Sequence, residues 1–160
     1  MTPSPADPAL LTRLLTRAVD AVARADAEDF DGAGAELAGF DADQARTVLG
    51  WVLRQGLEER HPDGLDADDL REAVARTARA AGWFPALDAR ILVLVLTAAL
   101  GEHPDPEEVP RLGHALVLQH SLLLVHDLVA AGGASAGPPL RRRIDAALAE
   151  VRRAETVEMP

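Results

Sequence analysis

The sequence predicts an all-α fold, a single-domain helical bundle of five or six helices, and three observations support this prediction. Apolar residues recur at spacings of three and four, which is the period of an amphipathic helix, and not at spacings of two. Alternating strand-forming runs are missing, since only 3% of the residues are aromatic and none is tyrosine. A length of 160 residues suits one hydrophobic core. We therefore expect a flexible N-terminus over 1–7, one helical domain over 8–156 and a flexible tail over 157–160.

The first predicted helix covers about 8–28. Asp7 is placed to cap its N-terminus, and Pro8 suits the first helical position because no N–H is needed there. Residues 29–40 contain several aspartates and glycines, a composition typical of loops. We expect this segment to be a flexible connector with at most one short helical turn.

The second and third helices have clearer start signals. Asp41 and Gln44 form a capping-box pattern, and an apolar stripe follows it, so the second helix should cover 41–60. After a turn, Asp66 can cap a third helix over about 67–81. Both helices should bury one apolar face.

The remaining helices include the predicted centre of the domain. A helix over about 89–100 contains ten successive residues, Ile91–Leu100, that are nearly all apolar, so we expect it to be buried on every side. Ten residues are too few to span a bilayer. A long helix over about 106–131, also expected at the centre, should kink at Pro110, which lacks a backbone N–H. The last helix, over about 140–155, has a single apolar stripe.

Composition excludes several functional classes. The chain has 26 acidic and 16 basic residues, all of the latter arginine, and its net charge of −10 disfavours nucleic-acid binding. The absence of cysteine excludes disulfides, thiolate nucleophiles and cysteine zinc sites. The first residues show neither the basic nor the apolar region of a secretory signal. We therefore expect a cytoplasmic protein with neither nucleic acid nor a membrane as a partner.

Three histidines, His114, His120 and His126, lie six residues apart in the helix predicted over 106–131. Steps of six residues turn a helix by about 240°, so the three rings should point to different faces. One metal ion could not collect them, and no Gly-rich phosphate loop or nucleophile motif is present. We therefore predict no metal, no cofactor and no catalytic residue. The histidines are interpreted as structural, with a pH-sensitive interfacial cluster as the alternative.

The segment His61-Pro62-Asp63 resembles the signature of J-domain co-chaperones. The resemblance covers little more than these three residues and implies a basic preceding helix that engages an Hsp70 partner. Here the preceding helix ends in Glu58-Glu59-Arg60, and a second copy of the motif occurs at His103. We interpret both copies as turns that stop one helix and start the next, and they leave an internal duplication open.

The segment from His120 to Asp127 resembles the first aspartate-rich helix of the trans-isoprenyl diphosphate synthases. In that family, further aspartates follow one and four positions after the first and carry magnesium for the diphosphate. Leu128 and Ala131 occupy those positions here. The resemblance therefore implies at most a decayed, inactive relative of that helical fold.

Two other groups are candidates for interaction. Trp83 and Phe84 follow a helix end and should pack in the core, with a partner or dimer contact as the alternative. Arg141 and Arg142 start the only basic helix, which is either a solvated face or a docking surface for an acidic partner.

These patterns predict a non-catalytic interaction or scaffold module that self-associates as a homodimer and has a possible protein partner. The dimer is expected because two apolar helices need more cover than the other helices of one chain supply. The alternative is a small-ligand-binding regulatory domain whose pocket lies between the helices predicted at 89–100 and 106–131. In that case His120, His126 and Gln119 should line the pocket.

Overall fold

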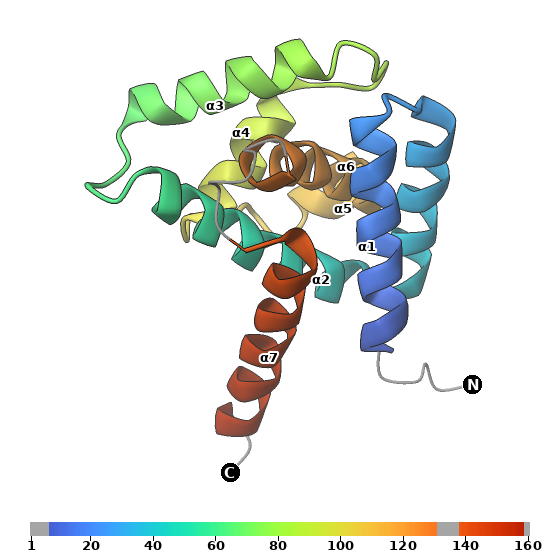
Figure 1. The fold of residues 1–160 in the computed structure, drawn as a ribbon, viewed down its shortest axis with the longest axis vertical. Helices are drawn as coiled ribbons and strands as arrows, with labels where there is room; N and C mark the ends of the chain where they lie inside the picture. The colour runs from blue at the N-terminus through green and yellow to red at the C-terminus, as the bar shows by residue number, and fades with distance from the viewer. Residues whose placement is uncertain (1–6, 131–137, 159–160) are drawn as a thin grey trace.

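The computed structural model describes residues 7–130 and 138–158, and within them every regular element is a helix (Figure 1). The elements are α1 (Pro8–Ala23), α2 (Ala27–Arg60), α3 (Ala67–Ala80), α4 (Ala89–Ala99), α5 (Glu108–Leu112), α6 (His114–Val125), the π-helix η1 (His126–Ala130) and α7 (Leu140–Glu158). The predicted all-α class is confirmed, although the described part contains seven α-helices and not five or six. The predicted flexible ends lie mostly outside the described residues, but α7 continues to Glu158, inside the expected tail.

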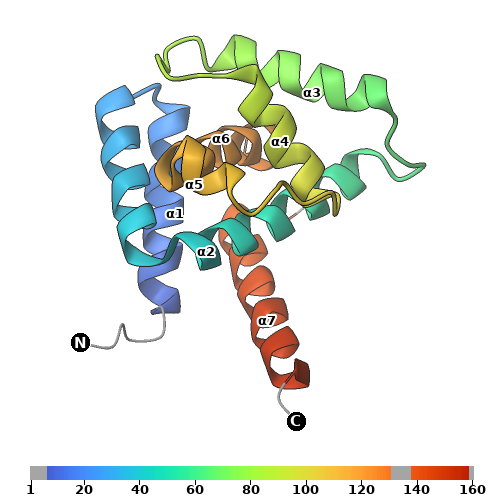
Figure 2. The same ribbon diagram turned by 180° about the vertical axis from the view of Figure 1, so that it is seen from behind.

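The centre of the molecule is α6. It contacts α1, α2, α3, α4 and α5 and lies between them in both views (Figures 1 and 2). Every residue over 117–125 is buried, including the polar ones. Burial on all sides therefore belongs to α6.

The expectation that the helix at 89–100 is the buried centre was wrong, although its bounds were close. The helix α4 buries Ile91, Leu92, Val95 and Leu96 on one face, whereas Val93 is 48% exposed. It packs mainly on α2, α3 and α6, and the exposure of Val93 shows that one side is left uncovered by the described part of the chain. An apolar sequence makes burial favourable, but it supplies no neighbour.

The expected connector at 29–40 is helical. Helix α1 ends at Ala23, earlier than predicted, and Ala25 turns the chain with a φ of 52°. Asp26 then caps α2, because its carboxylate accepts a hydrogen bond of 3.0 Å from the Asp29 N–H. The first half of α2 packs on α1 through a buried face made of Phe30, Ala33 and Leu37. This burial outweighs the low helix propensity of the glycines in the segment.

A kink divides α2 at Asp41, where φ is −163° and ψ is 88°. The Asp41 carboxylate accepts a hydrogen bond of 3.0 Å from the Gln44 N–H, so the predicted cap at this position is confirmed. The kink turns the second half of α2 across α6 (Figure 1). Because of this kink, α2 covers two faces of the central helix α6.

The long helix predicted over 106–131 is interrupted, but at Gly113 and not at Pro110. Pro110 lies in the first turn of α5, where backbone N–H groups have no helical acceptor, so its missing N–H costs nothing. Gly113 has φ 101°, a left-handed conformation that favours glycine. The chain restarts there as α6 and passes into η1 at His126.

Helix α7 extends away from the body of the molecule (Figures 1 and 2). Its first half packs against α1 and α2 through Arg143, Ile144, Ala147 and Leu148, in agreement with the predicted stripe. Among the described residues, no helix is both long enough and apolar enough to cross a membrane.

Candidate functional site

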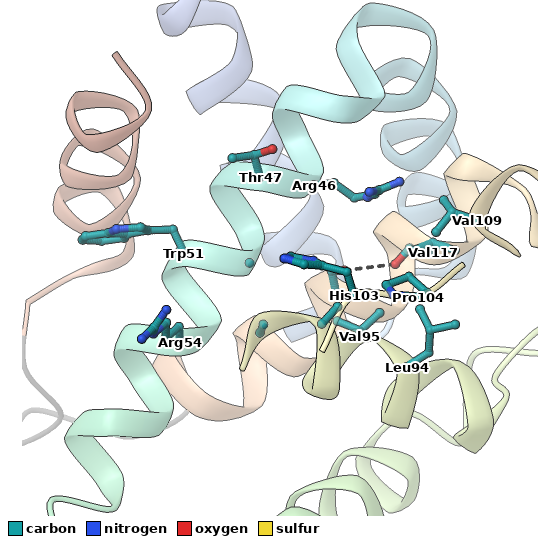
Figure 3. Close-up of a pocket in the computed structure, with 14 residues that line it drawn as sticks. Arg46, Thr47, Trp51, Arg54, Leu94, Val95, His103, Pro104, Val109 and Val117 are labelled. Carbon is teal, nitrogen blue, oxygen red and sulfur yellow. Dashed lines mark hydrogen bonds between the residues drawn. The ribbon is translucent and has the colours of Figure 1, made fainter. Parts of the chain in front are cut away.

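A pocket of about 310 Å³ lies between the second half of α2, α4, the segment after α4, and α6 (Figure 3). Its apolar lining comes from α2, α4, the segment after α4, α5 and α6. These residues are Trp51, Leu94, Val95, Ala98, Ala99, Pro104, Val109 and Val117. The volume is at the small end of the roughly 300–1,000 Å³ that ligand pockets occupy.

Helix spacing and small side chains form this pocket. Arg46, Gly50 and Arg54 are four residues apart, so they share one face of α2. A methyl group added at Gly50 would meet no atom within 4 Å, which shows that the space above this glycine is open. On α4, Ala98 and Ala99 likewise leave room that larger side chains would fill.

The polar groups around the pocket are cationic or neutral, and no lining residue is acidic. In Figure 3, Arg46 extends from α2 to the side where Val109 lies, while the Trp51 ring points the opposite way. Arg54 donates a hydrogen bond of 3.1 Å to Glu58, one turn further along α2. Arg46 is half-buried and has no ion pair or hydrogen bond to any described residue. His103 is exposed at the mouth.

His120 lies outside the pocket and has a structural position. It is fully buried, its Nε2 accepts a hydrogen bond of 3.0 Å from the Asp88 N–H, and its Nδ1 lies 2.7 Å from the Leu116 carbonyl oxygen. The ring is therefore the neutral tautomer that carries its proton on Nδ1. Burial lowers the pKa of His120, and the Leu116 carbonyl and the Asp88 charge offset part of this effect.

His126 does not meet His120 in a shared site. It lies half-buried beside a small cavity of about 40 Å³, where burial lowers its pKa and the neighbouring Asp127 charge partly offsets the change. Gln119 is bound elsewhere, since its amide donates a hydrogen bond of 2.8 Å to Asp31. Over residues 7–130 and 138–158, no three histidine or carboxylate side chains form a group that could hold a metal ion.

Asp127, on which the synthase resemblance depends, is paired with an arginine. Arg76 Nη2 lies 2.8 Å from Asp127 Oδ2, and Arg76 Nε donates to the same carboxylate. Hydrogen bonding to Asp127 raises the pKa of Arg76. The carboxylate therefore joins α3 to the end of the central helix.

The structure places Trp83 and Phe84 in an aromatic cluster beside His120. Phe84 is buried, and its ring centre lies 5.2 Å from that of Phe30 and 5.7 Å from that of His120. Trp83 is partly buried with its ring centre 5.5 Å from that of Phe30. Edge-to-face contacts of this kind stabilise a core.

Arg141 and Arg142 are exposed on α7, and neither lines the pocket. The next residue, Arg143, is buried and binds the Glu59 carboxylate at 2.7 Å and the Pro138 carbonyl at 2.9 Å. The first turn of α7 therefore presents two arginines to solvent and uses the third to attach to α2.

A second hollow, the α3–α4 groove, is open and almost wholly apolar, with a volume of about 290 Å³. The exposed Val93 lies in it. Its lining residues are Leu70, Arg71, Val74, Ala75, Ala78, Ala89, Val93, Leu96 and Thr97. This groove is the side of α4 that the rest of the described chain leaves uncovered.

The sequence placed a possible pocket between the helices that the structure labels α4 and α6, but it did not identify Arg46, Trp51 or His103 as lining residues. The four-residue spacing of Arg46, Gly50 and Arg54 is the signal that could have found the α2 wall. The chain matches no protein-family model, no curated protein and no solved structure.

Proposed function

We propose that the chain is a non-catalytic binding domain whose site is the pocket between α2, α4 and α6. The observation that supports this proposal is a concave, mainly apolar surface with a few polar groups at its edge, the usual form of a small-molecule site. This is the regulatory, ligand-binding alternative from the sequence, with the pocket lined by other side chains than His120 and His126.

The hydrogen bonds of the lining hydroxyl groups support a role without catalysis. Ser121 Oγ donates to the Val117 carbonyl oxygen at 3.1 Å, and Thr47 Oγ1 donates to the Asp43 carbonyl oxygen at 2.9 Å. A nucleophilic hydroxyl would instead donate to a base. The buried titratable groups, His120 and Asp127, are engaged in structural contacts away from the pocket.

Binding can be tested with 1-octanol as a neutral apolar probe. Trp51 lines the pocket, so a Trp83→Phe background isolates its fluorescence, which should change saturably as the alcohol is added. Ala98→Phe should abolish the change by filling the pocket. Ala35→Phe, on an exposed part of α2, is the matched control and should bind as before. A response without saturation, or one that survives Ala98→Phe, would contradict the proposal.

Self-association is a second candidate function, and the α3–α4 groove is the observation that favours it. An apolar hollow that leaves Val93 48% exposed would be covered if it met the same face of a second chain. Both signs of charge lie beside it, with Asp68 paired to Arg71 on α3 and Asp88 paired to Arg90 at the start of α4. In a two-fold dimer, the aspartates beside the groove of one chain could pair with the arginines beside the groove of the other.

Sedimentation equilibrium tests this dimer. The wild-type chain should show a mass near twice 17.0 kDa at micromolar concentration, and Val93→Asp should show the monomer mass. Val157→Asp, the same change at a valine that is 84% exposed on α7, should leave the mass unchanged. A wild-type mass that stays at the monomer value would exclude the dimer.

A further inference from the structure

Arg46 differs from every other arginine that is at least partly buried. In the described part of the chain these arginines are Arg17, Arg46, Arg76 and Arg143. The other three each have a carboxylate partner, Arg17 with Asp29 at 2.7 Å, Arg76 with Asp127 at 2.8 Å and Arg143 with Glu59 at 2.7 Å. Only Arg46 has no such partner among residues 7–130 and 138–158, and it lines the pocket.

This lack of a partner is unexpected in so acidic a chain. Acidic residues exceed basic ones by ten, yet no acidic side chain lines the pocket, whereas Arg46, Arg54 and His103 do. Removing a guanidinium from water is unfavourable unless an anion or hydrogen-bond acceptor compensates for it. A carboxylate suits the planar guanidinium, because two parallel N–H···O bonds can form between them.

We infer that the pocket binds a small organic monocarboxylate with an apolar body, and that Arg46 pairs with its carboxylate. This inference rests on the proposed function and specifies the ligand class for the same site. One unpaired arginine matches one negative charge, since Arg54 is already bound to Glu58. The apolar body would lie against the wall formed by Leu94, Val95 and Val117.

The size of the pocket guides the choice of probe. Its volume of about 310 Å³ is at the small end for ligand sites, so a short ligand such as an eight-carbon acid suits it. Octanoate and 1-octanol therefore form a matched pair of probes that differ in charge and share the alkyl chain.

Isothermal titration calorimetry of the full chain with both probes tests the inference. Octanoate should bind about tenfold more tightly than 1-octanol, the order expected for a charged hydrogen-bonded pair in a partly buried site. Arg46→Gln should remove this preference, so that the two probes bind with similar affinity. Arg13→Gln makes the same charge change at an exposed arginine on α1 and should keep the preference.

The outcomes separate this inference from the proposed function. Equal binding of the two probes to the wild type, or a preference that survives Arg46→Gln, would overturn the inference of a carboxylate ligand. The proposed function of the pocket as a binding site would be unaffected. Competition of inorganic phosphate with octanoate at equal concentration would overturn the ligand class. Binding of neither probe would overturn the proposed function as well. If Arg46→Gln does not fold, the salt dependence of binding to the wild type tests the inference instead. Added NaCl should weaken the binding of octanoate and leave the binding of 1-octanol unchanged.

Discussion

Helices α4 and α6 are both predominantly apolar in sequence, but they have opposite positions in the fold. Helix α6 packs against five other α-helices and is buried throughout 117–125, whereas α4 packs mainly on three and exposes Val93. Polar residues make the contrast sharper, since α6 buries Gln119, His120 and Ser121. Each of these has a hydrogen-bond partner inside the protein, so burial costs little.

The comparison shows that an apolar helix becomes the centre only when the topology surrounds it. The two halves of the kinked helix α2, together with α1, cover α6 on several sides. Helix α4 lies at the edge, and the pocket and the α3–α4 groove flank it. The apolar surface of α4 is therefore only partly covered.

Side-chain truncations in α6 and in α4 should give the largest difference in the free energy of unfolding. Leu122→Ala in α6 removes a fully buried side chain and should lower the free energy of unfolding by about 2–5 kcal/mol. Val93→Ala in α4 should change it by less than about 0.5 kcal/mol, because the valine is half exposed. Urea denaturation at a fixed protein concentration measures both. Equal losses would mean that α4 is as central as α6.

The next largest effect concerns the ion pair at the end of the central helix. Arg76→Met leaves the Asp127 carboxylate, whose side chain is only 10% exposed, without its cation. We expect a loss of about 1–3 kcal/mol, below the value for a fully buried pair because Arg76 itself is 34% exposed. The control is Arg71→Met, which breaks the exposed pair with Asp68 and should have almost no effect. Thermal unfolding distinguishes them, and indistinguishable midpoints would refute this asymmetry.

A smaller effect is expected where α2 approaches α6. A Cβ at Gly34 would lie 2.9 Å from Gln119 Cγ, so Gly34→Ala should force the two helices apart and cost about 1 kcal/mol after the gain in helix propensity. Gly39→Ala on the same helix meets nothing within 4 Å and should stabilise the fold by about 0.5–1 kcal/mol. Chemical denaturation of the two variants gives the comparison. Stabilisation by both substitutions would show that the side chain of Gln119 moves freely aside.

The smallest effect is the pH dependence that His120 confers. Burial lowers its pKa in the folded state, so the unfolded chain takes up the proton first as the pH falls below about 6.5. Stability should therefore be complete above that pH and decline below it, and His126 acts in the same direction. In His120→Gln, denaturation between pH 7.5 and 5.5 should show a shallower decline than in the wild type. An unchanged slope would place the acid sensitivity elsewhere.

The sequence alone determined the helical class and many of the boundaries. Asp7, Asp41 and Asp66 cap helices in the structure as their spacing predicts, because each carboxylate accepts a hydrogen bond from a backbone N–H only two or three residues away. The bounds of α3 and α4 follow for the same reason. The helix at 27–40 was missed, since its glycines indicate a loop and its stability comes from packing against α1.

The tertiary structure alone decided which apolar helix is central and where the candidate pocket lies. Arg46 and Val117 are far apart in the chain, and only the crossing of α2, α4 and α6 brings them to one pocket. The same holds for Arg76 and Asp127: their residue types show that each can form an ion pair, but only the fold decides that they pair with each other. Local signals are read within one turn of a helix, whereas burial and site geometry depend on contacts between helices, which no local pattern contains.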